Sequence, residues 1–66
     1  MNKDKIYTHY DEINKSINSC TNIYQLDSCE RMINTFGNLY KDEKYDNLLV
    51  HLWDNFTIKR IKLNNI

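Results

Sequence analysis

The stretch YDNLLVHLWDNF, residues 45–56, decides the fold of this chain. Its apolar residues recur at steps of three and four, and such steps return side chains to one face of an α-helix at about 100° per residue. These apolar residues are Tyr45, Leu48, Leu49, Leu52, Trp53 and Phe56. The spacing therefore predicts a helix with one apolar face over about residues 43–62.

Two earlier stretches carry the same spacing. The first contains Ile6, Tyr10, Ile13, Ile17 and Cys20, and the second contains Leu26, Cys29, Ile33, Phe36 and Tyr40. They predict helices over about residues 3–19 and 22–41. No stretch shows the strict alternation of apolar and polar residues that is typical of a half-buried strand. The sequence therefore predicts an all-α fold.

Short polar segments separate the three stretches. We expect Thr21 or Asn22 to be the N-cap of the second helix; with Asn22 as the cap, Gln25 falls at the third helical position of an approximate capping box. We expect Asp42 to be the N-cap of the third helix. Because short connections join antiparallel neighbours, residues 1–66 are expected to form one small domain, a three-helix bundle of short antiparallel helices.

The only glycine of the chain, Gly37, lies near the expected end of the second helix. Glycine often follows the last residue of a helix, but it can also lie inside one at a cost of about 1 kcal/mol relative to alanine. Leu39 and Tyr40 stay in phase with the preceding apolar residues. We therefore expect the helix to continue through Gly37.

Composition limits the class of protein. Nine basic and nine acidic residues cancel, so no net charge draws the chain to nucleic acid or to an anionic membrane. Neither a signal-peptide pattern nor an apolar run of about 18 residues is present, which predicts a cytoplasmic protein. Ten Asn, eight Ile and no Ala or Pro indicate an AT-rich genome. Bacterial, phage and parasite genomes are all open, and the cytoplasm is that of a host cell if a phage encodes the chain.

Residues with reactive or metal-binding side chains are few. Cys20 and Cys29 lie on apolar faces and are expected in the core, about 10 Å apart along a helix and too far apart for a disulfide. His9 and His51 are expected at the surface. Because metal-ligand spacings, a glycine-rich loop and a nucleophile beside a base are all missing, we predict a protein without catalytic residues, metal or cofactor, and not an enzyme.

The chain has more apolar residues than three core faces need. Val50, Ile58 and Ile61 fall on the side of the third helix opposite Tyr45, and Tyr7 and Tyr24 point away from their apolar faces. Tyrosine and tryptophan are enriched at interface centres. The predicted partner-binding residues are Tyr7, Tyr24, Val50, Trp53, Ile58 and Ile61.

Small size, neutral charge and this apolar surplus favour a protein-interaction module. It would suit a phage or mobile-element accessory protein that binds and inhibits a host protein complex, and self-association into a homodimer is also expected. One alternative is a small nucleic-acid-binding protein that uses Lys59, Arg60 and Lys62, although three cations are few beside the six to ten phosphate contacts typical of such proteins. Another alternative is a structural or virion-associated subunit.

Overall fold

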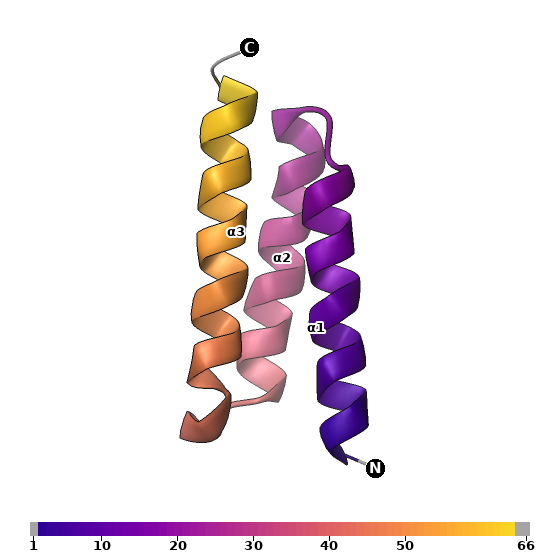
Figure 1. Ribbon diagram of the computed structural model, residues 1–66, viewed down its shortest axis with the longest axis vertical. Helices are drawn as coiled ribbons and strands as arrows, with labels where there is room; N and C mark the ends of the chain where they lie inside the picture. Colours follow the sequence, from indigo (N-terminus) through magenta and orange to yellow (C-terminus); the bar gives the residue numbers. More distant parts are fainter. Residues whose placement is uncertain (1, 65–66) are drawn as a thin grey trace.

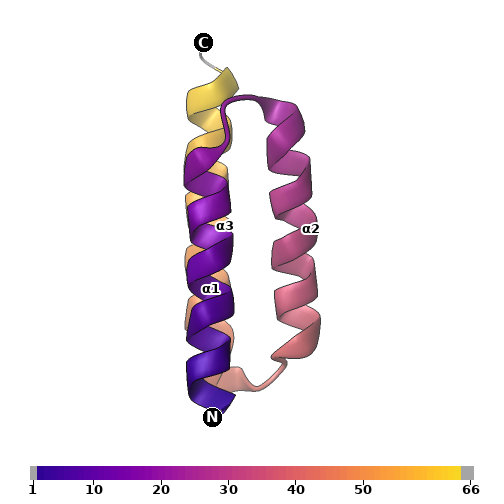
Figure 2. The same ribbon diagram turned by 90° about the vertical axis from the view of Figure 1, so that its right-hand side faces the viewer.

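Three helices packed side by side make up this protein. The computed structural model describes the backbone of residues 2–64 and the side chains of residues 5–64. It contains helices α1 (Asn2–Ser19), α2 (Ile23–Leu39) and α3 (Asp46–Asn64), with a single 3₁₀ turn, η1 (Glu43–Tyr45), before α3. Helix α2 runs antiparallel to α1 and α3, so α1 and α3 point the same way (Figures 1 and 2). Within residues 2–64 there is no strand, and the predicted all-α three-helix bundle is confirmed.

The first connection is capped as the sequence predicts, with one difference. The side-chain oxygen of Asn22 accepts a hydrogen bond from the backbone N–H of Gln25 at 2.9 Å, which makes Asn22 the N-cap of α2. The side-chain oxygen of Gln25 accepts from the backbone N–H of Thr21 at 2.6 Å, not from that of Asn22. In this variant of the capping box, the Gln25 side chain bonds to Thr21, the residue before the N-cap, rather than to Asn22. The two hydrogen bonds together hold the connecting segment against the start of α2.

The second connection differs from the prediction. Helix α2 ends at Leu39, where the backbone N–H of Tyr40 donates to the carbonyl of Phe36 at 3.0 Å. Asp42 is an N-cap, but of η1, where its carboxylate accepts from the backbone N–H of Lys44 at 3.2 Å. The backbone N–H of Tyr45 then bonds to the carbonyl of Asp42 at 2.9 Å. This bond spans three residues, so the chain forms a tight 3₁₀ turn and α3 begins at Asp46 rather than at about residue 43.

The core lies along the axis of the bundle, and every helix contributes to it. Its buried side chains are those of Ile6, Ile13, Ile17, Cys20, Leu26, Cys29, Ile33, Phe36, Leu52 and Phe56. All of them belong to the three apolar stretches found in the sequence. The remaining apolar side chains of the α3 stretch, such as Leu49 and Trp53, are half-buried and pack against this core.

One histidine belongs to the edge of the core rather than to the open surface. His9 is half-buried, and its ring centroid lies 5.6 Å from that of Phe36 and 5.9 Å from that of Tyr40. Both contacts are edge-on, an arrangement that aromatic rings prefer. The expectation of a surface histidine is therefore wrong for His9 but confirmed for His51, which is exposed.

Gly37 lies inside α2, as the phase of Leu39 and Tyr40 predicts. Its backbone φ is not positive, so its conformation does not require glycine. A Cβ atom built on Gly37 would lie 3.5 Å from the two methyl carbons of Leu49 on α3, which is an ordinary van der Waals distance. Alanine therefore fits at this position without moving either helix.

We predict that Gly37→Ala stabilises the protein by about 0.5–1 kcal/mol, because alanine loses less backbone entropy than glycine in a helix. Urea denaturation followed by circular dichroism measures the change. Thr35→Ala, at an exposed position of the same helix, is the control, and we expect a smaller effect there. Destabilisation by Gly37→Ala would mean that α2 and α3 approach too closely at this point to accept a methyl group.

Candidate functional site

An exposed apolar surface runs along α3, on the side away from the core. Val50, Ile58 and Ile61 each leave between 52% and 56% of their surface exposed. At about 100° per residue, Ile58 lies about 80° and Ile61 about 20° around the helix from Val50, so the three share one face. We define the outer face of α3 as Val50, Asp54, Thr57, Ile58 and Ile61. The sequence prediction that these three aliphatic residues point away from the core is confirmed.

The outer face is not needed to complete the bundle. The contribution of α3 to the core is made by buried Leu52 and Phe56 with the half-buried residues beside them. Val50, Ile58 and Ile61 are exposed and belong neither to the buried core nor to the partly buried residues that pack against it. Helix α3 therefore has two apolar sides, one inside the protein and one in solvent.

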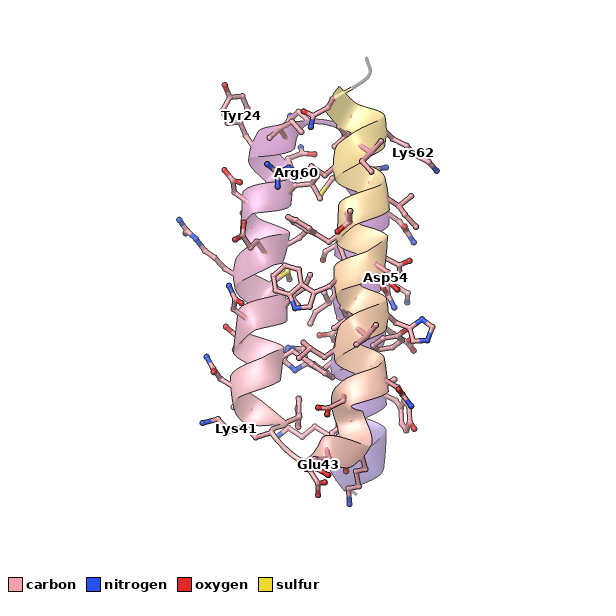
Figure 3. The ribbon with its side chains drawn as sticks, turned by 90° about the vertical axis from the view of Figure 1, so that its left-hand side faces the viewer. Tyr24, Lys41, Glu43, Asp54, Arg60 and Lys62 are labelled. Atoms are coloured by element: carbon pink, nitrogen blue, oxygen red, sulfur yellow. The ribbon has the colours of Figure 1, made fainter. Side chains whose placement is uncertain are left out.

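An acidic residue lies in the middle of the outer face. Asp54 is exposed and is four residues from both Val50 and Ile58, so it lies one helical turn from each (Figure 3). Asp54 was not among the predicted partner-binding residues, which are all aromatic or aliphatic. Its position at the same helical spacing was the available signal.

The structure does not bring all six predicted partner-binding residues together. Trp53 is half-buried, and its ring packs edge-on against Phe56 with centroids 5.6 Å apart, so it borders the outer face but belongs largely to the core. Tyr7 is exposed on α1. Tyr24 is 84% exposed and points away from the bundle at the start of α2 (Figure 3). Only Val50, Ile58 and Ile61 share a single surface, and the role of all six residues stays a prediction.

The three cations near the end of α3 point in different directions. The ammonium of Lys59 donates to the backbone carbonyl of Asn18 at 3.1 Å, and so provides a partner for a carbonyl in the last turn of α1. Arg60 lies on the side of α3 that faces α2, and Lys62 extends on the opposite side (Figure 3). They do not form one basic surface. Nucleic-acid binding through these residues remains an untested alternative.

The two thiols lie much closer together than the helical rise between the two residues predicts. The Sγ atoms of Cys20 and Cys29 are 3.5 Å apart, and both cysteines are buried and free. The expectation of about 10 Å placed Cys20 in the turn and counted the rise of about two helical turns from there to Cys29. Cys20 does lie in the turn that follows α1, but the chain reverses there and its side chain packs back onto Cys29 of α2, which the helical rise alone does not take into account. Burial, helped by the hydrogen bond with Cys20, raises the pKa of the Cys29 thiol from 9.0 to about 11.

Other side-chain clusters offer little chemistry. His9 and Glu12 line a shallow hollow of about 440 Å³ with Lys5, Thr8 and Tyr40. No group of three or more His, Cys, Asp or Glu residues in the described part of the chain is arranged to hold a metal ion. Across residues 2–64, no helix has the length and apolar character needed to cross a membrane. Comparisons with protein-family models, curated proteins and solved structures found no match to this chain.

The raised pKa of Cys29 predicts a loss of stability at high pH. The unfolded chain ionises Cys29 near pH 9, whereas the folded protein keeps the thiol protonated until about pH 11. The stabilisation is therefore fully present below pH 9 and is lost as the pH rises from 9 to 11. We expect the urea midpoint of the wild type to fall over this range by more than that of Cys29→Ala, which lacks the thiol.

All other ionisable side chains are present in both proteins, so their effect on stability cancels in the comparison. Each protein is denatured with urea at pH 8, 9, 10 and 11. If the urea midpoints of the two proteins fall equally, the pKa of Cys29 is the same in the folded and unfolded states, which would contradict the prediction.

Proposed function

We propose that this protein is a small, non-enzymatic protein-interaction module that binds a partner protein through the outer face of α3. The observation that carries the proposal is the exposure of Val50, Ile58 and Ile61 on one side of a helix whose other side already completes the core. A fully buried aliphatic side chain contributes about 1.5–3 kcal/mol relative to an exposed one, so covering three of them supplies a useful part of a binding free energy.

Asp54 favours a partner of different sequence over a second copy of this chain. In a two-fold symmetric contact the same patch is used by both subunits. If such a contact were centred on the outer face of α3, it would bring two Asp54 carboxylates together in a poorly hydrated interface, which is unfavourable. The partner that suits this face is an apolar surface with a lysine or arginine opposite Asp54. Self-association, expected from the sequence, is not shown.

The amino-acid composition suggests the type of genome that encodes this protein, and with it a biological role. A 66-residue chain with no Ala or Pro and ten Asn is typical of an AT-rich genome. A single exposed binding face on a chain of this size suits an accessory protein of a phage or mobile element that blocks a host protein complex. The described residues provide an exposed surface for such a contact.

The test replaces two aliphatic residues of the face by lysine. Ile58→Lys with Ile61→Lys removes the apolar contact but keeps good helix formers near the C-terminal end of α3, where positive charge is favourable. We expect an unchanged helical circular dichroism signal and at least about 30-fold weaker binding, as for a central interface residue. Thr35→Lys with Asn38→Lys, two exposed positions of α2, is the control with the same change in charge.

The partner is first captured from a host-cell lysate on the immobilised wild type, and its affinity for all three proteins is then measured by calorimetry. The proposal requires that the partner binds the wild type and the α2 control equally well and the α3 variant weakly. A partner that binds the α3 variant as tightly as the wild type would place the binding site elsewhere.

Asp54 provides a second test on the same partner. If a cation lies opposite this carboxylate, Asp54→Asn removes a charge pair and slows association, and the remaining binding depends less on salt. The association rate of the wild type should be clearly lower at 500 mM than at 50 mM NaCl, whereas the two rates of the variant should be similar. The same salt dependence in both proteins would mean that Asp54 faces no charge.

A further inference from the structure

The buried thiols of Cys20 and Cys29 lie in contact at the first connection of the bundle. Cys20 lies in the turn after α1, and Cys29 lies in α2 with its side chain directed at that turn. The thiol of Cys20 donates to the backbone carbonyl of Ser16 at 3.1 Å. Since Cys20 has one thiol hydrogen, the hydrogen in the 3.5 Å contact between the sulfurs comes from Cys29. The two thiols therefore form a short chain of hydrogen bonds.

The distance between the two sulfur atoms is short enough for a small movement to join them. A disulfide bond is about 2.05 Å long, so the sulfur atoms need to approach by about 1.5 Å. Cys20 lies between α1 and α2, outside both helices, and its backbone is therefore freer to adjust than that of a helical residue. The sulfurs already touch each other.

A small oxidant has a route to the thiols. A hollow of about 300 Å³ lies over the pair, between the end of α1 and the first half of α2. Besides the two cysteines it is lined by Ser16, Ser19, Gln25, Ser28 and Met32. The hollow is partly polar, and a molecule the size of hydrogen peroxide fits within it.

We propose that Cys20 and Cys29 form a redox-active dithiol that a hydroperoxide converts into an intramolecular disulfide. One cysteine, as the thiolate, attacks the peroxide, the O–O bond breaks, and a sulfenic acid and hydroxide form. The sulfur of the other cysteine attacks the sulfenic sulfur and releases water. In total two thiols lose two electrons and two protons, and one hydrogen peroxide becomes two water molecules.

The disulfide would join the first connection of the bundle to α2. It closes the segment 20–29 into a loop, which restricts the unfolded chain and so stabilises the folded one. A domain of this size has little stability to spare, so one cross-link is a large change. Because the raised pKa of Cys29 keeps its thiol protonated at neutral pH, we expect oxidation to be slow there and to become faster as the pH rises. The site lies between α1 and α2, so it is independent of the outer face of α3.

The test treats the reduced, purified protein with hydrogen peroxide. We expect the intact mass of the monomer to fall by about 2 Da and both thiols to become inaccessible to iodoacetamide in denaturant. The midpoint of thermal unfolding should rise by about 10 °C, and dithiothreitol should reverse the mass change and the shift. Peptide mapping separates these changes from oxidation of methionine.

Cys29→Ser is the control. It keeps a small side chain that can donate to Cys20, but it cannot form the bond, so peroxide should not raise its unfolding midpoint. Three results for the wild type would overturn the proposal: two thiols that remain open to alkylation, a disulfide-linked dimer, or thiols that gain oxygen without joining.

Discussion

Everything in this structure depends on the burial of one apolar face from each of three helices. A domain of this length buries only about 60% of the surface that its unfolded chain exposes, so no helix is dispensable to the core. Ile13 of α1, Phe36 of α2 and Leu52 of α3 are all fully buried at its centre. The two connections are set by side chains that cap helices, Asn22 and Asp42, which hold the faces in register.

The same constraint explains why α3 has a surface to offer. Once Leu52 and Phe56 face the core, the geometry of the helix places Val50, Ile58 and Ile61 in solvent. It also explains the thiol contact, because the turn after α1 must fold back for α2 to reach the core, and this turn carries Cys20 towards Cys29. The proposed binding face and the proposed dithiol are thus both consequences of how three faces close on one core.

Most of the fold follows from the spacing of apolar residues, because that spacing repeats within each helix. The phase of Leu39 and Tyr40 was enough to place Gly37 inside α2, and Asn22 was one of the two residues, with Thr21, expected as its cap. The spacing of apolar residues does not predict the path of the chain between the helices. For this reason the 3₁₀ turn Glu43–Tyr45, the contact of Cys20 with Cys29 and the rings packed around His9 were not predicted. The exposure of Val50 and Ile58 was predicted, but the place of Asp54 between them was not.

The central claim is that the three helices of one chain complete the core and leave the outer face of α3 free. Light scattering over a concentration series tests this claim most directly. The account predicts a monomer of 8.0 kDa at every concentration. A species of twice that mass that separates only when the protein unfolds would contradict it, because a second copy would then be part of the folded structure.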